Sequence, residues 1–409
     1  MLTPLSLLIG LLFGLLSLAI PVTGALLVWL SVRRSKRTIR AVRIHERPNQ
    51  LKNTTSERAH TSEHVRLLPW RERWREPAVL VPLLAGVFLL LLPLGFGRGL
   101  LQHAFPAGAE EPHAFQGAVQ ELTRPDGTKI HVEVFGSDNA PQLVLTHGWG
   151  TTSTEWYYMK KHLADRFRVI VWDLPGLGQT EEPKDDSDSL DQMASDLHQV
   201  LSIAQGKPVV LVGHSIGGMT NLTFAKLYPE SLGSQVKGIV QIDTTYTNPV
   251  KTTSNSRLNI ALQKPLAEPI LHLMILFSPI VRIVNWISYQ EGILHLKNAS
   301  SSFAGSETRG QVDLVSRTQA QSTPGVVARG TLAMFHWDGT TVLPQINVPV
   351  LILVGKQDTT TLPSASATME RSIPGAQMQV INPSSHYALL EKNEVVNDAI
   401  AKFAAVVLR

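Results

Sequence analysis

Two long stretches near the start of the chain contain no charged side chain. They cover residues 5–31 and 77–97, and both reach the roughly 20 apolar residues that a bilayer crossing needs. Prolines inside them, such as Pro21 and Pro82, are compatible with helices, because proline is more frequent in spanning helices than in soluble ones. Residues 1–100 therefore predict a membrane module with two transmembrane helices.

The loop between these stretches, residues 32–76, is strongly basic. It holds 13 Lys and Arg against 5 Asp and Glu, whereas the rest of the chain holds 24 against 28. Short basic loops stay on the cytoplasmic side, so we expect a multi-pass integral membrane protein with both chain ends on the non-cytoplasmic side. A signal peptide is the alternative for residues 5–31, but no positive side chain precedes the apolar run. Nucleic acid is not an expected partner, because the basic charge is confined to one loop.

The hydrophobic pattern changes after residue 116, where short apolar runs alternate with stretches of helical periodicity. Two runs flank Pro125-Asp126-Gly127, a turn sequence that predicts a β-hairpin. Nearly continuous apolar runs are typical of parallel strands buried on both faces, and their alternation with helices predicts an α/β fold. Six such runs predict strands at residues 142–147, 168–173, 208–214, 238–243, 348–355 and 378–382.

The α/β pattern has one long interruption. Residues 246–340 contain apolar, helical stretches but no clear strand, so they are expected to form a cap inserted into a domain that covers residues 117–409. Residues 101–116 contain proline and glycine and are expected to be the linker to the membrane module. Within the cap, residues 269–281 carry no formal charge but are too few to span a bilayer. They predict either the wall of a pocket or a surface that touches the membrane.

The sharpest motif is Gly213-His214-Ser215-Ile216-Gly217, of the form G-x-S-x-G. It follows a predicted strand and opens a predicted helix, which is the context of a nucleophile elbow. Glycines permit a tight turn that exposes the serine hydroxyl, and the following helix N-terminus favours developing negative charge. The plainer interpretation, an ordinary turn serine, stays open at this point.

Further motifs follow the other predicted strands in a fixed order. They are His147-Gly148-Trp149-Gly150, Asp173-Leu174-Pro175-Gly176-Leu177-Gly178, VLILVGKQD and SSHYALLE. Together with GHSIGG, they resemble the α/β-hydrolase family, and within it the serine esterase- and lipase-like members with a cap domain. The resemblance implies an α/β-hydrolase fold with a mostly parallel, eight-stranded sheet and a helical cap, here preceded by two transmembrane helices.

The resemblance also implies roles for individual residues. The family order along the chain is serine, acid, histidine, which places Ser215 as nucleophile, Asp358 as acid and His386 as general base. Asp243, at the end of an earlier strand, is the alternative acid, and Asp358 could instead cap the helix that follows it. The backbone N–H groups of Ile216 and Trp149 are expected to form the oxyanion hole.

His147 and His214 lie inside motifs but are expected to serve the structure rather than to act as bases. Trp149 could likewise be plain core packing. The absence of cysteine excludes a cysteine nucleophile, disulfides and thiolate metal sites, and neither a cofactor nor a metal is expected.

The expected function is a membrane-anchored serine hydrolase that cleaves a carboxylic ester through an acyl-enzyme on Ser215. The substrate is expected to be a small-molecule or lipid ester, and membrane lipids are the expected surroundings. The alternatives are other chemistries of the same fold, such as an amidase, a C–C bond hydrolase or a cofactor-free perhydrolase. A non-catalytic membrane receptor or scaffold is a further alternative. The sequence does not predict the acyl chain, the alcohol or the oligomeric state.

Overall fold

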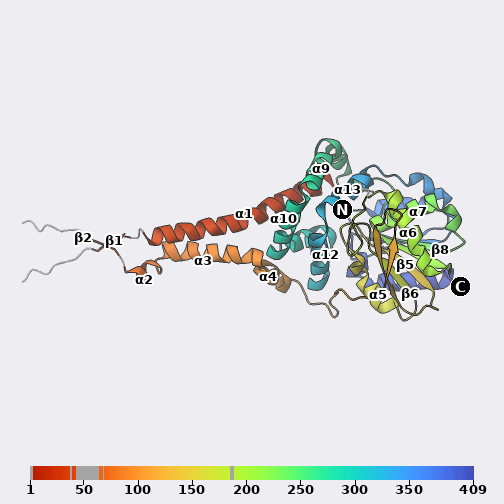
Figure 1. Cartoon of the computed structure of the whole chain (residues 1–409), viewed down its shortest axis with the longest axis horizontal. Helices are drawn as coiled ribbons and strands as arrows, with labels where there is room; N and C mark the ends of the chain where they lie inside the picture. The colour runs from red at the N-terminus through yellow and green to blue at the C-terminus, as the bar shows by residue number, and fades with distance from the viewer. Residues whose placement is uncertain (1–2, 37–38, 43–63, 68, 185–187) are drawn as a thin grey trace, which may run out of the picture.

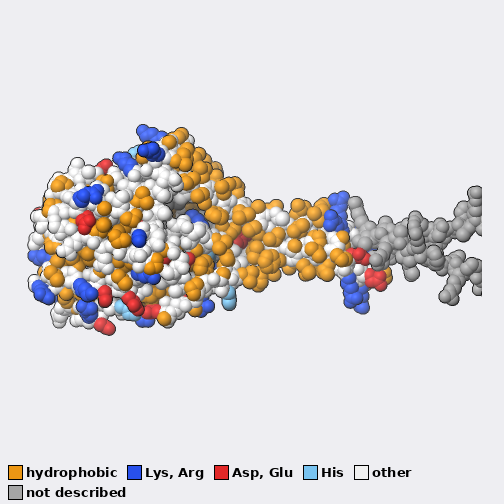
Figure 2. Space-filling view, turned by 180° about the vertical axis from the view of Figure 1, so that it is seen from behind, with side chains coloured by type: hydrophobic (Ala, Val, Ile, Leu, Met, Phe, Trp, Pro, Cys, Tyr) orange, Lys and Arg blue, Asp and Glu red, His pale blue; other side chains and the backbone are white. Residues whose placement is uncertain are grey.

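The computed structural model describes residues 3–36, 39–42, 64–67, 69–184 and 188–409. A globular domain sits at one end of a two-helix stalk (Figure 1). The stalk consists of α1 (Pro4–Ser35) and α3 (Pro77–Leu91), the latter continued by the 3-10 turn η1 (Leu92–Leu94). Within the described residues, these two helices are long and apolar enough to cross a membrane. Apolar side chains cover the stalk surface (Figure 2).

The two stalk helices run antiparallel and approach closely at a pair of glycines. A Cβ atom on Gly24 would lie 2.9 Å from the carbonyl oxygen of Gly86, and one on Gly86 would lie 2.8 Å from the carbonyl oxygen of Gly24. Small residues at such contacts let helices in membranes pack backbone against backbone. Near the far end, Arg34 Nη1 donates to the carbonyl oxygen of Ala78 at 3.3 Å, which fixes the same register.

Most of the basic loop 32–76 lies outside the described residues. Its described parts contain β1 (Ile39–Val42) and β2 (His64–Leu67), which pair antiparallel, and the short helix α2 (Trp70–Arg73). They extend from the end of the stalk that is far from the globular domain (Figure 1).

The linker expected at residues 101–116 begins in the structure as part of a helix. Helix α4 (Phe96–Ala104) covers residues 101–104 and packs on the cap. Arg98 Nη1 donates to the Tyr289 hydroxyl at 2.6 Å, and Gln102 Nε2 donates to Asp313 Oδ1 at 2.9 Å. The helix forms because the first proline of this region, Pro106, comes only after it. The stalk is therefore attached to the cap by a helix and not by a free linker.

The globular domain is built on an eight-stranded sheet in the order β10-β9-β8-β7-β5-β6-β4-β3. The six strands from β10 to β6 are parallel, whereas β4 pairs antiparallel with β6 and β3 pairs antiparallel with β4. This confirms the mostly parallel sheet, and the strands coincide with the predicted hairpin and six apolar runs. They are β3 (Ala118–Thr123), β4 (Lys129–Phe135), β5 (Gln142–Thr146), β6 (Arg168–Trp172), β7 (Val209–His214), β8 (Val236–Ile242), β9 (Val350–Gly355) and β10 (Gln377–Ile381).

Helices cover both faces of the sheet, so neighbouring residues of its strands enter different cores. Val144 of β5 packs in the cluster beneath α6, α7 and α14, while Leu145 packs in the cluster beneath α5, α15 and α16. This is why the central strands, such as β5, β6, β7 and β9, form continuous apolar runs in the sequence. These elements and the short turns beside them are η2 (Ser153–Trp156), α5 (Tyr157–Leu163), α6 (Leu190–Val200), η3 (Leu201–Ala204), α7 (Ile216–Leu227), η4 (Pro229–Ser231), α14 (Pro363–Ser372), α15 (Ala388–Glu391) and α16 (Asn393–Val407).

Between β8 and β9 the chain leaves the sheet and forms a helical cap, which lies between the sheet and the stalk (Figure 1). The cap has no strand among its described residues, as the sequence pattern predicts for this insertion. Its elements are η5 (Pro249–Lys251), α8 (Ser256–Leu262), the π-helical turn η6 (Gln263–Ala267), α9 (Glu268–Leu276), α10 (Ser278–Glu291), α11 (Ile293–Ser302), α12 (Arg309–Gln321), α13 (Pro324–Phe335) and η7 (Thr340–Gln345).

Candidate active site

Ser215 occupies a strained turn between β7 and α7. Its backbone has φ 53° and ψ −117°, a conformation that side-chain-bearing residues rarely adopt. The motif needs its glycines because a Cβ atom at either position would clash with neighbouring backbone. A Cβ atom on Gly213 would lie 2.4 Å from the backbone of Gly217, and one on Gly217 would lie 2.1 Å from the carbonyl oxygen of Thr146. The G-x-S-x-G spacing therefore forms a sharp elbow with Ser215 at its apex.

The structure brings Ser215, His386 and Asp358 into one hydrogen-bonded line. His386 Nε2 lies 3.2 Å from Ser215 Oγ, and His386 Nδ1 lies 2.9 Å from Asp358 Oδ2. The three residues follow the carboxyl ends of β7, β10 and β9, which meet at one edge of the parallel sheet. All three side chains are buried. The arrangement can take a proton from the serine hydroxyl and hold the resulting imidazolium against a carboxylate.

The ionisation of the pair suits that transfer. Burial lowers the pKa of His386 below its usual value of 6.5, and the charge of Asp358 offsets this only in part. Burial alone would raise the pKa of Asp358, but His386 and hydrogen bonds from Thr361 lower it. Asp358 also accepts the backbone N–H of Thr360 at 2.7 Å. At neutral pH, His386 is then an uncharged base and Asp358 is an ionised partner.

Asp243, the alternative acid, lies elsewhere in the network. Its carboxylate accepts the backbone N–H of Gly355 at 2.7 Å and that of Ala388 at 3.0 Å. Burial and the nearby charge of Asp358 raise its pKa well above the ordinary value. Asp243 therefore ties the end of β9 to the start of α15, and Asp358 is the carboxylate in contact with His386.

Two backbone amides stand beside the elbow without partners. Among the residues that the structure describes, neither the Trp149 N–H nor the Ile216 N–H has a hydrogen-bond acceptor. The Trp149 side chain is fixed separately, because its indole Nε1 donates to the carbonyl oxygen of Val327 at 2.9 Å. The ring also packs so closely on Gly330 that a Cβ atom there would lie 2.1 Å from it. The indole thus connects the loop after β5 to cap helix α13.

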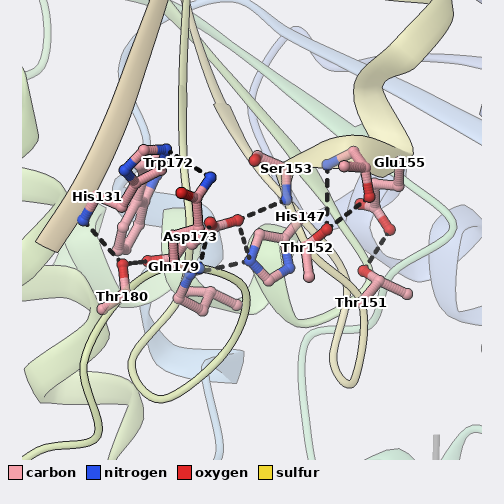
Figure 3. Close-up of polar contacts among 12 residues, drawn as sticks. His131, His147, Thr151, Thr152, Ser153, Glu155, Trp172, Asp173, Gln179 and Thr180 are labelled. Atoms are coloured by element: carbon pink, nitrogen blue, oxygen red, sulfur yellow. Dashed lines mark hydrogen bonds and ion pairs between the residues drawn. The ribbon is translucent and has the colours of Figure 1, made fainter. Parts of the chain in front are cut away.

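Glu155 is a buried carboxylate of the site that sequence reasoning missed. It accepts the backbone N–H of Gly148 at 2.7 Å and the Thr151 hydroxyl at 2.6 Å (Figure 3). It also lies 3.1 Å from Nδ1 of His214, whose Nε2 donates to the carbonyl oxygen of His386 at 2.9 Å. Burial alone would raise the pKa of Glu155, but the charge of His214 lowers it. Glu155 and His214 therefore connect the Trp149 loop to the His386 loop.

His147 belongs to a neighbouring polar cluster (Figure 3). Its Nε2 accepts the backbone N–H of Leu174 at 2.9 Å, so this nitrogen carries no proton. The Asp173 carboxylate accepts the backbone N–H groups of Ser153 and Gln179. Among the described residues, neither His147 nor His214 is hydrogen-bonded to Ser215. Their contacts hold loops around the site.

Comparisons with known proteins agree with this geometry. A model of the alpha/beta hydrolase family matches residues 143–399. The chain is 25% identical over 280 residues to an uncharacterized protein of Mycobacterium tuberculosis, covering 65% of this chain and 75% of that protein. It is 24% identical to a pimeloyl-[acyl-carrier protein] methyl ester esterase of Vibrio campbellii, covering 68% of this chain and 99% of the esterase.

The fold has solved counterparts as well. An esterase from Thermogutta terrifontis matches with a TM-score of 0.59 at 24% identity, covering 72% of this chain and 100% of its own. This likeness concerns the fold. Because the family model spans more than half of the sequence, the chain belongs to the alpha/beta hydrolase family.

Proposed function

We propose that the protein is a membrane-anchored serine hydrolase that cleaves a carboxylic ester through an acyl-enzyme on Ser215. The observation that carries the proposal is the hydrogen-bonded line from Ser215 Oγ through His386 to Asp358, at the apex of a strained elbow. The similarity to a methyl ester esterase supports ester cleavage.

Each group has a role in the proposed reaction. His386 Nε2 takes the Ser215 proton while Oγ attacks the ester carbonyl, and the Trp149 and Ile216 amides stabilise the oxyanion that forms. Each such donor contributes roughly 3 kcal/mol to lowering the barrier. His386 then protonates the leaving alcohol, and an acyl-enzyme remains. Water, deprotonated by His386, attacks the acyl group and releases the acid, so one water is consumed for each ester bond that breaks.

A fluorophosphonate probe tests the proposal, because it phosphonylates activated serines. The full-length protein in detergent should be labelled, and Ser215→Ala should abolish both labelling and hydrolysis of p-nitrophenyl butyrate. Ser364→Ala is the matched control, since Ser364 lies exposed on α14. Undiminished labelling of Ser215→Ala would refute the assignment.

We further propose that α1 and α3 span the membrane with the basic loop in the cytoplasm and the catalytic domain on the opposite side. The supporting observations are the apolar stalk and the 13 Lys and Arg in residues 32–76. Reporter fusions at residue 55 should give a cytoplasmic signal, and fusions after residue 110 should give a non-cytoplasmic signal. A cytoplasmic signal from both fusions would contradict this topology.

A further inference from the structure

A cavity of about 450 Å³ lies where the stalk meets the cap, and its volume is within the size range of ligand pockets. One wall is the first half of α1, residues 4–18, called here the cap-facing half of α1. The other wall comes from cap helices, with apolar side chains such as Ile270, Met274, Val281 and Val284. The lining also includes Trp149 and Gly150, and Thr359 and Thr360, which follow Asp358 in the chain. The cavity therefore leads to the loops that surround Ser215.

The cap-facing half of α1 extends beyond its stalk partner. Helix α1 has 32 residues, which is about 48 Å at 1.5 Å per residue. The 18 residues of α3 and η1 give about 27 Å, close to the hydrocarbon thickness of a bilayer. Because Gly24 faces Gly86 and Arg34 reaches Ala78, α3 pairs with the second half of α1. The first half is left to contact the cap.

Polar and close contacts hold that first half in place. Leu5 N–H donates to Asn259 Oδ1 at 2.9 Å, and the hydroxyls of Ser17 and Ser288 are 2.6 Å apart. A Cβ atom on Gly14 would lie 3.2 Å from Val284 Cγ1. A membrane helix thus forms part of the catalytic domain's cavity.

The cavity opens at an apolar surface. Leu11, Leu15 and Ile280 are exposed and also line the cavity. Helix α10 meets the preceding α8–α9 segment at 97°, and these segments together are long and apolar enough to be a broken span or a re-entrant loop. Leu276 is 70% exposed, and the apolar surface continues from the stalk onto the cap (Figure 2). Residues 269–281 were expected to form either a pocket wall or a surface that touches the membrane, and they offer surface for both. Ile270 and Met274 line the cavity, whereas Leu273 and Leu276 are exposed on the outside.

One cation faces this largely apolar space. Lys297 of α11 lines the cavity, and among the described residues its ammonium group has neither an ion pair nor a hydrogen bond. No Asp or Glu belongs to the described residues that line the cavity. Burial lowers the pKa of Lys297, so its charged form is costly until an anion compensates it.

We propose that the cavity binds a membrane lipid ester with an anionic head group, which enters from the bilayer between α1 and the cap. The acyl chain lies between the cap-facing half of α1 and α9–α10, and Lys297 pairs with the anionic group. This inference rests on the proposed function, because the ester carbonyl must reach Ser215. Hydrolysis adds one water across the ester bond and yields a fatty acid and the residual alcohol.

Filling the cavity tests the acyl-chain site. A Cβ atom on Gly10 has no neighbour within 4 Å, and Gly10 lines the cavity, so Gly10→Phe should occupy the space without a clash. In mixed micelles, the ratio of kcat/KM for dipalmitoyl phosphatidylglycerol to that for p-nitrophenyl butyrate should fall at least tenfold. Leu12→Phe is the matched control, because Leu12 is exposed on the same helix turn and does not line the cavity. An equal effect of both variants, or none from Gly10→Phe, would overturn the acyl-chain site.

Changing the cation tests the head-group site. Lys297→Met should lower the ratio of kcat/KM for dipalmitoyl phosphatidylglycerol to that for uncharged dipalmitoylglycerol at least tenfold, and Lys297→Arg should restore most of it. An unchanged ratio would overturn the head-group assignment. Fluorophosphonate labelling distinguishes failure of the cavity proposal from failure of the proposed function. If the protein is labelled at Ser215 and cleaves p-nitrophenyl butyrate but cleaves neither lipid, only the cavity proposal is contradicted. Absence of labelling and of all ester hydrolysis contradicts the proposed function.

Discussion

Replacing Asp358 by Asn should lower kcat by about four orders of magnitude, as the corresponding change does in serine proteases. The Asp358 carboxylate accepts the N–H of His386 Nδ1 at 2.9 Å, which leaves Nε2 free to receive the Ser215 proton. An amide at this position can donate to Nδ1 and hold the wrong tautomer. Steady-state kinetics on p-nitrophenyl butyrate measures the loss, and an intact thermal midpoint shows that the fold survives.

Asp243→Asn is the matched control for this experiment. Asp243 is equally buried, but its oxygens accept the N–H groups of Gly355 and Ala388 instead of contacting His386. Because the pKa of Asp243 is raised, its carboxyl group is already hard to ionise. Replacing it by the uncharged amide of Asn therefore removes little charge. We expect a loss in kcat of less than about tenfold, or 1.4 kcal/mol. If Asp243→Asn proved the more damaging change, Asp243 would be the catalytic acid.

Replacing Glu155 by Ala should destabilise the protein by about 3–5 kcal/mol, because each buried donor that loses its acceptor costs about 1–3 kcal/mol. The change would leave the Gly148 N–H, the Thr151 hydroxyl and His214 Nδ1 without their shared acceptor. Since the Gly148 amide adjoins Trp149, the Trp149 loop should also lose its fixed position. Chemical denaturation in detergent and kcat for the folded fraction measure the two effects.

Glu155→Gln separates the hydrogen bonds from the charge. The amide oxygen can still accept from Gly148 and His214, and its NH₂ group can donate to the Thr151 hydroxyl. We therefore expect this variant to lose much less stability than Glu155→Ala. Equal stability of Glu155→Ala and the unchanged protein would show that the network does not hold the two loops.

The central strands of the sheet could be predicted from the sequence because they are buried on both faces. Runs such as residues 142–147 and 208–214 are continuous and apolar, and strands β5 and β7 lie within them. Ser215 could be placed because the elbow needs glycines at fixed positions beside it, as the 2.1 Å approach at Gly217 shows. The pairing of Asp358 with His386 came from the resemblance to the hydrolase family. The two residues are 28 positions apart, and that separation alone does not show whether their side chains are in contact.

Other features depend on contacts between distant segments. The sequence pattern around Glu155 is that of an ordinary surface-helix carboxylate, and only the fold brings Gly148 and His214 against it. Helix α4 could not be predicted because glycines and prolines in and around it are typical of a loop. The residues that it contacts, Tyr289 and Asp313, lie about 200 positions away in sequence. The cavity wall supplied by α1 could not be predicted either, because an apolar helix reads as a membrane span whatever its first half contacts.

The central claim is that the reaction passes through an ester of Ser215, and trapping that species tests it most directly. The full-length protein in detergent is mixed with p-nitrophenyl butyrate, quenched in acid during the initial burst, digested, and analysed by mass spectrometry. The account predicts one butyryl adduct on the peptide that contains Ser215, formed with the burst of p-nitrophenol and absent from Ser215→Ala. Steady hydrolysis by Ser215→Ala at the unchanged rate, with no acyl adduct on this peptide in the unmodified protein, would contradict it.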